Sequence, residues 1–418
     1  MSAAVATWGI AALATGGVIL RPWRLPEAIW AVAGAALLVA IGLLSAGDAW
    51  HGVAKGTDVY LFLIGMMVLA ELARAEGLFD WLAGRAARLA GGSASRLFDL
   101  VYLVGIVVTV FLSNDATAVV LTPAIAAVTK AVRAEQPLPY LFICAFIANA
   151  ASFVLPISNP ANLVIYGSHM PPLLEWLPRY APPSVLSIGA TYGVLRFSQR
   201  HALRRPIASD VPSGALSAGG TLAAFGIVAT AIVLMLASAF DLALGLPTCL
   251  AGLATAAIVL LLQRAAPWGV LRGISWGVLP LVAGLFVLVE ALDRTGAIGL
   301  LSDGLRGAAA ASPAQATWGA GMVLGVASNL LNNLPAGLIA GTAVQAAQVP
   351  ATVTGAVLIG VDLGPNLSVT GSLATILWLT ALRREGEYVG AWTFLKLGVV
   401  VMPPALILAL GGLLLGGG

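Results

Sequence analysis

Charged side chains are scarce in this 418-residue chain. Asp, Glu, Lys and Arg together make up 9% of it and hydrophobic residues 60%, whereas soluble domains carry about 25% charged residues. A water-soluble fold of this size would have too little polar material to cover its surface. We therefore expect lipid to be the solvent, and a bacterial inner (cytoplasmic) membrane to be the location.

Side chains that bind metals or perform catalysis are also few. The two cysteines, Cys144 and Cys249, both lie in apolar surroundings, and two isolated thiols cannot build the three- or four-sulfur cage of a tightly held metal. The chain has three histidines, all in expected loops, and no phosphate-binding glycine loop of the G-x-x-x-x-G-K-[ST] type. We expect no cofactor, no fixed metal, no nucleic-acid partner and no enzymatic activity, which leaves a transporter driven by an ion gradient.

Long apolar runs recur along the whole chain. They are continuous rather than alternating, which is typical of membrane helices and not of a membrane β-barrel. A helix needs about 20 residues to cross the hydrocarbon core. The runs predict an all-α polytopic membrane protein, and they lie at residues 28–44, 59–70, 221–237, 250–262 and 395–410.

The chain contains an internal repeat. Residues 59–71 resemble residues 278–290, and the alignment places Glu71 on Glu290 and matches a glycine on each side of both. At almost the same offset, Asn114-Asp115 matches Asn332-Asn333. Several matches in one order predict two related halves.

The repeat and the apolar runs together predict two inverted repeats of five transmembrane helices. Each half would add one re-entrant hairpin and one broken helix, and an odd number of crossings per half requires opposite orientations. The first repeat would cover 1–206, the linker 207–220 and the second repeat 221–418. The hairpins are expected at about 97–133 and 314–347, and the broken helices at about 138–165 and 352–380.

Basic residues orient this layout, because they favour the cytoplasmic side. With a cytoplasmic linker, 16 basic residues fall on the cytoplasmic side and four on the other, with Lys396 near the start of the last span. Both termini are then periplasmic. The four on the periplasmic side are Lys55, Arg179, Arg294 and Arg306.

Polar residues interrupt the apolar pattern at four places, two in each half. Pro156, Pro160 and Pro365 should break their helices, because proline removes a backbone donor and clashes with the preceding turn. Freed backbone groups in a membrane must line protein or a wet cavity, so these breaks predict a central binding site. The expected substrate-binding residues are Asn114, Asp115, Asn159, Asn162, Asn332, Asn333, Asp362 and Asn366.

Asp115 and Asp362 are the expected proton-coupling residues. A carboxylate at the bilayer centre costs at least about 2.5–3.5 kcal/mol, and such groups usually mark ion or proton pathways. The alternative for each is a plain helix cap. Glu71 and Glu290 lie near expected helix ends, where a structural role is the simpler interpretation.

Three stretches carry a resemblance to a known family. Residues 111–123, with Ser113-Asn114-Asp115, resemble the first hairpin of the arsenite efflux pump family (ArsB type) of the ion transporter superfamily. Residues 332–335 resemble its second hairpin. Residues 362–365, Asp-Leu-Gly-Pro, followed by 371–379, are similar to its most recognisable stretch, although 366–370 depart from the family form.

The resemblance covers nearly the full chain and implies export of arsenite and antimonite from the cytoplasm. It implies exchange for protons by alternating access, or coupling to a separate soluble pump ATPase as partner. Arsenite at neutral pH is a neutral trihydroxide, so a site of amides without Arg, Lys or thiols suits it. The alternatives are a sodium-coupled carboxylate carrier, a cation/proton antiporter of the same superfamily, or an uncoupled channel.

Overall fold

The computed structural model describes residues 2–167, 170–209 and 214–416. Every regular element in these ranges is helical, so the predicted all-α class is confirmed. Residues 210–213 of the expected linker lie outside the described ranges, and the helix that follows begins at Ala218, just inside the range expected for the linker.

The same order of elements occurs twice along the chain. The first half contains α1 (Ala3–Leu20), α2 (Glu27–Ala40), α3 (Ala46–Lys55), α4 (Thr57–Ala75), α5 (Leu78–Ala90), α6 (Ala94–Leu112), α7 (Asn114–Ala116), α8 (Thr122–Ala131), α9 (Leu138–Ala150), α10 (Pro160–Tyr166) and α11 (Leu173–Ser198). The second half contains α12 (Ala218–Ala239), α13 (Gly245–Gln263), α14 (Trp268–Gly273), α15 (Val278–Arg294), α16 (Ala297–Ala311), α17 (Pro313–Leu331), α18 (Asn333–Ala347), α19 (Ala351–Leu363), α20 (Leu373–Arg384) and α21 (Ala391–Gly416).

Membrane-spanning character is evident by length and composition. Among the residues that the structure describes, five helices are long and apolar enough to cross a bilayer, namely α1, α6, α12, α13 and α21. The pair α3–α4, bent by 48°, makes a sixth if it is counted as one span. The sequence did not predict α3, α14 or α16, because each is short or of mixed polarity. The chain is therefore a multi-pass membrane protein.

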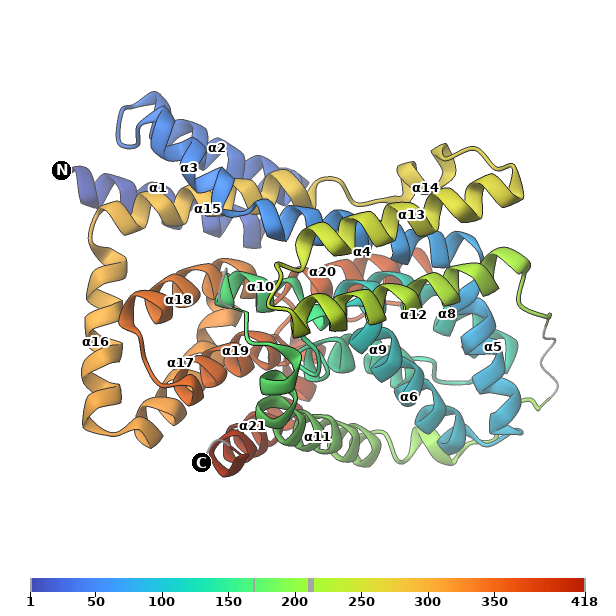
Figure 1. Ribbon diagram of the computed structural model, residues 1–418. Coiled ribbons are helices and arrows are strands. Elements are labelled where there is room, and N and C mark those ends of the chain that lie inside the picture. The colour runs from blue at the N-terminus through green and yellow to red at the C-terminus, as the bar shows by residue number, and fades with distance from the viewer. Residues whose placement is uncertain (1, 168–169, 210–213, 417–418) are drawn as a thin grey trace.

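The helices form two layers (Figure 1). One, here called the scaffold layer, contains α1–α4 and α12–α15, in which α4 packs on α13 and α2 packs on α15. The other, here called the hairpin layer, contains the remaining helices, in which α17 packs on α19 and α11 on α21. Helices α5 and α16 run across the direction of the long helices, at opposite ends of the molecule. This placement is the one expected for interface helices of two inverted halves.

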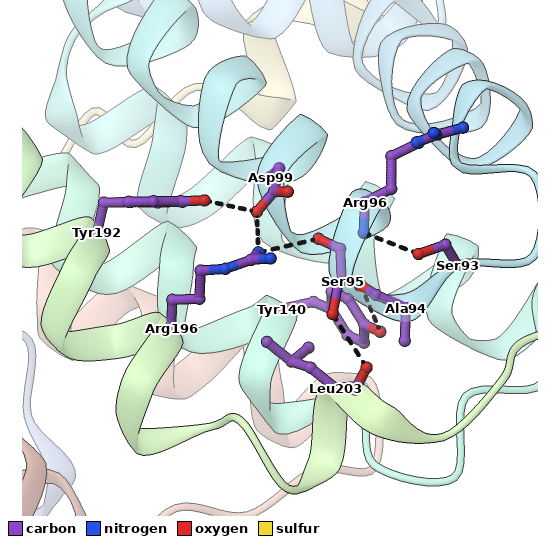
Figure 2. Close-up of polar contacts among 9 residues, drawn as sticks. All are labelled: Ser93, Ala94, Ser95, Arg96, Asp99, Tyr140, Tyr192, Arg196 and Leu203. Carbon is purple, nitrogen blue, oxygen red and sulfur yellow. Dashed lines mark hydrogen bonds and ion pairs between the residues drawn. The ribbon is translucent and has the colours of Figure 1, made fainter.

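Polar contacts tie the start of α6 to the end of α11 (Figure 2). Asp99 accepts a hydrogen bond of 2.8 Å from the Tyr192 hydroxyl and forms an ion pair with Arg196. The Ser95 hydroxyl donates to the carbonyl of Leu203, 3.2 Å away, just beyond α11. The chain leading to the second half is thereby fixed to the hairpin layer.

Glycine allows α4 and α13 to approach closely. A Cβ at Gly65 would collide with the backbone carbonyl of Thr248, and one at Gly252 would lie 2.6 Å from the carbonyl oxygen of Gly65. Backbone atoms cannot move aside as a flexible side chain can, so this crossing requires glycine. The contact joins the two halves within the scaffold layer.

We expect Gly65→Ala to lower the free energy of unfolding by about 1–3 kcal/mol, because the added methyl group overpacks a backbone contact. Thermal unfolding in detergent measures the effect. Gly189→Ala on α11 is the matched control, since nothing lies within 4 Å of its added Cβ. Equal unfolding midpoints for the two variants would contradict the close approach.

Candidate functional site

Each hairpin turns at one residue of positive φ. Ser113 follows α6 with φ 102°, and Asn332 follows α17 with φ 70°. Residues other than glycine rarely adopt such backbone angles, and these angles persist where the surrounding structure holds them. A helix begins directly after each turn, with Asn114 and Asn333 as first residues.

These turns correct the expected pairing of the hairpins by one residue. Ser113 corresponds to Asn332 and Asn114 to Asn333, because both turns and both helix starts coincide. Asp115 then corresponds to Leu334, not to Asn333. The repeat offset is therefore constant through the hairpins, and the acid of the first hairpin has an apolar counterpart.

The first broken helix is stabilised by asparagine side chains. Helix α9 ends at Ala150, and Pro156 and Pro160 lie in or just after the break rather than at its start. The Nδ2 of Asn162 donates to the carbonyls of Ser152, Leu155 and Pro156 at 2.9, 3.3 and 3.2 Å. These carbonyls lost their helical partners at the break, so Asn162 replaces the missing donors.

Asn329 stabilises the second break in a similar way. Its Nδ2 donates to the carbonyl of Gly364 at 2.9 Å, and its Oδ1 accepts from both the backbone N–H and the hydroxyl of Ser368 at 3.0 and 2.8 Å. Pro365 lies inside this break. Asn329 was absent from the predicted site. The sequence feature that could have indicated Asn329 is its place as a polar residue in an apolar helix, three positions before Asn332.

Polar side chains also join the two broken helices to each other. The carboxylate of Asp362 accepts from the Ser152 hydroxyl and from the Asn159 Nδ2, both at 2.8 Å. The Nδ2 of Asn149 donates to the Oδ1 of Asn366 at 2.9 Å. Asp362 is completely buried. Asp362 in the second half is therefore linked to the first half by two buried hydrogen bonds.

A small cavity lies between the two hairpin turns. It has a volume of about 20 Å³, which is room for about one water molecule. Asn114 and Asn333 both line it, and the Oδ1 of each is buried without a hydrogen-bond partner among the described residues. The lining consists of Leu63, Asn114, Asp115, Asn159, Pro160, Val278, Asn333, Leu334, Leu373 and Ala374.

The structure therefore brings together half of the predicted substrate-binding residues. Asn114, Asp115, Asn159 and Asn333 line the cavity. The other four predicted residues are not part of its lining, and all four have backbone or cross-helix partners that explain their presence. Those four residues are Asn162, Asn332, Asp362 and Asn366.

Two crevices flank the cavity between the layers. The wide crevice, about 650 Å³, is lined by Lys55, Phe286, Glu290 and Leu338 among others. The narrow crevice, about 70 Å³, is lined by the residues at the corresponding positions of the other half. In the same order, these are Ile274, Met67, Glu71 and Val119. The two crevices thus occupy equivalent places in the two halves, and they differ about ninefold in volume (650/70).

Comparison with known proteins points to a transporter. A family model described as "Citrate transporter" matches residues 11–382. An arsenical pump membrane protein of Yersinia enterocolitica is 29% identical over 400 residues, covering 91% of each chain. One of Escherichia coli is 28% identical over 412 residues, covering 95% of each. The predicted resemblance to arsenite efflux pumps is thus confirmed.

Similarity to a solved structure concerns the fold. The YdaH transporter of Alcanivorax borkumensis matches with a TM-score of 0.54 at 16% identity, over 88% of this chain and 86% of that one. At this identity the likeness shows the fold alone.

The two acids should differ in their effect on stability. Asp362→Asn places an amide N–H₂ against two buried donors, so we expect unfolding to become easier by about 1–3 kcal/mol. Asp115 forms no hydrogen bond or ion pair with any residue in the described ranges, so Asp115→Asn should leave the unfolding midpoint within error. Thermal unfolding in detergent separates them; a larger loss for Asp115→Asn would refute the distinction.

Proposed function

The chain belongs to the citrate transporter family, and from this premise we propose that it exports arsenite and antimonite from the cytoplasm. The proposed mechanism is exchange for protons at the cavity between the hairpin turns, by alternating access. The similarity to arsenical pump membrane proteins over nearly the whole chain supports this substrate class.

The main support is the chemistry of the cavity. Asn114 and Asn333 present two buried amide oxygens without a donor, one from each half. A buried acceptor without a partner costs about 1–3 kcal/mol. A neutral trihydroxide carries O–H donors that would satisfy both, and the lining contains no Lys or Arg to attract an anion.

Asp115 is the proposed proton carrier. It lines both the cavity and the narrow crevice, and within the described ranges no cation pairs with it. An uncompensated carboxylate in the membrane favours its protonated form. In this proposal the substrate and the proton alternate at the same site, which widens to admit the trihydroxide, because its present volume of about 20 Å³ holds about one water molecule.

The contacts between the layers support alternating access. Among the described residues, the hydrogen bonds and ion pairs that join distant helices lie within one layer, for example between Lys55 and Glu290 or between Ser152 and Asp362. The layers meet through apolar contacts, such as those of α4 with α10 and α15 with α18. The hairpin layer could therefore slide without breaking polar contacts, which would open one crevice as the other closes.

A carboxylate carrier is the second candidate, because the family model is described by citrate. A multivalent anion needs cationic or multiple N–H donors. Among the described residues, the cavity offers instead the carboxylate of Asp115, no Lys or Arg, and the amides of Asn114 and Asn333, which can both donate and accept. The carboxylate and the lack of a cation favour a neutral substrate over an anion.

Everted membrane vesicles provide the main test. We expect proton-driven accumulation of arsenite that a proton uncoupler abolishes, and no accumulation of citrate under the same gradient. In Asp115→Asn the flux should no longer depend on the gradient, because the carrier of the proton is lost. Citrate uptake that arsenite does not compete with would refute the proposal.

Asn333→Ala tests the amide contact. Loss of one hydrogen bond of about 0.5–1.5 kcal/mol should weaken apparent arsenite affinity about two- to tenfold, measured as the half-saturating concentration of uptake. Gln315→Ala at the exposed start of α17 is the control. An unchanged half-saturating concentration in Asn333→Ala would place substrate recognition elsewhere.

A further inference from the structure

The narrow crevice holds two carboxyl groups. Its polar lining consists of Glu71, Ser113, Asp115 and Ser275, and the rest of its wall is apolar or glycine. Its volume of about 70 Å³ gives room for a few water molecules. Asp115 is thus connected, through a space of water size, to a second acid outside the central cavity.

Glu71 lies between this space and the exposed side chain of Arg74. Its side chain is 8% exposed, whereas that of Arg74, one turn later on α4, is 51% exposed. The guanidinium of Arg74 donates to both carboxylate oxygens, with distances of 2.8 Å from Nε and 2.5 Å from Nη2. The Arg74 end of the pair is therefore exposed, and the Glu71 end lines the crevice.

A glycine on α14 makes room for this carboxylate. A Cβ at Gly273 would collide with Oε1 of Glu71. The α14 backbone thus packs directly on the acid, which holds it at the wall of the crevice. The charged groups around Glu71 are Arg74 on α4, Asp80 on α5 near Arg74, Asp115 on α7, and Arg272 next to Gly273.

The repeat-related Glu290 has a different environment. Lys55 of α3 donates to it at 2.7 Å and Arg294 at 3.1 Å, and Arg294 also pairs with Asp48. It is therefore fixed in an ion-pair network of two cations and two anions. Within the described part of the chain, Glu71 has a single cationic partner, on its own helix. The residue equivalent to Lys55 is Ile274, which is apolar.

We propose that Glu71 relays the proton between Asp115 and the membrane face that carries Arg74. The protonated carboxyl of Asp115 gives its proton to a crevice water, which passes one of its protons to the carboxylate of Glu71. Glu71 then releases the proton to solvent beside Arg74, and the reverse sequence loads Asp115. The inference rests on proton-coupled export as proposed above, with Glu71 as a positioning and transfer group outside the substrate cavity.

The test compares three substitutions in proteoliposomes: Glu71→Gln, Glu290→Gln and Asp115→Asn. Glutamine keeps the size of the side chain but cannot carry the proton. We expect Glu71→Gln to slow proton-driven arsenite uptake at least about tenfold, and to flatten its pH profile. Arsenite–arsenite exchange, which moves no net proton, should stay within twofold of the unaltered protein, and Glu290→Gln should keep the pH profile.

Gly273→Ala is a second test that leaves the acid in place. The added methyl group displaces the Glu71 carboxylate from its present position at the crevice wall, so proton-driven uptake should fall while exchange persists. Gly269→Ala on the same helix is the control, since nothing lies within 4 Å of its Cβ.

The outcomes separate the relay from the proposed function. If Asp115→Asn removes proton dependence but Glu71→Gln retains the normal rate and pH profile, the relay is wrong and proton-coupled export stands. If Glu71→Gln lowers driven uptake and exchange equally, the residue is structural and the relay is again wrong. If neither the unaltered protein nor Glu290→Gln responds to the proton gradient, the coupling itself is refuted.

Discussion

The structure depends on satisfying backbone groups at four interruptions inside a membrane. A broken helix in lipid leaves carbonyls and N–H groups that water cannot reach, and each unsatisfied group costs several kcal/mol. Here the side chains of Asn162 and Asn329 supply the missing donors. Asp362 then joins the two breaks through Ser152 and Asn159. The two halves are consequently joined at the breaks of their broken helices. The turns of both hairpins meet at one cavity.

Similar backbones in the two halves carry different chemistry. The helix starts after Ser113 and after Asn332 coincide, yet the next position but one is Asp115 in one hairpin and Leu334 in the other. A symmetric pair of acids in so small a cavity would repel each other. One acid beside two amides leaves the site able to exist in a neutral form. This asymmetry supports proton exchange with a neutral solute better than it supports transport of an anion.

Much of the fold could be predicted from the sequence. Apolar runs indicate where long helices lie, and proline with clustered asparagine predicts the interruptions. The roles of single polar residues could not be predicted, because Asn162 and Asp362 look like ligands in the sequence and make internal hydrogen bonds in the structure. The pairing of the hairpins was wrong by one residue, since only the backbone angle of Ser113 and Asn332 shows where each turn lies. The orientation in the membrane and the division into repeats at 1–206 and 221–418 stay predictions.

The distribution of polar contacts connects stability with movement. Asp362 and the asparagines stabilise the hairpin layer from within, and Glu290 with Lys55 and Arg294 does the same for the scaffold layer. Direct contacts between the layers are apolar, so one layer can move against the other without leaving a buried polar group unpaired. A protein that must fold stably and also shift one layer against the other needs this separation. Glu71 is compatible with it, because its cationic partner is on its own helix. Its contact with the crevice can then change with the position of the hairpin layer while Arg74 stays beside it.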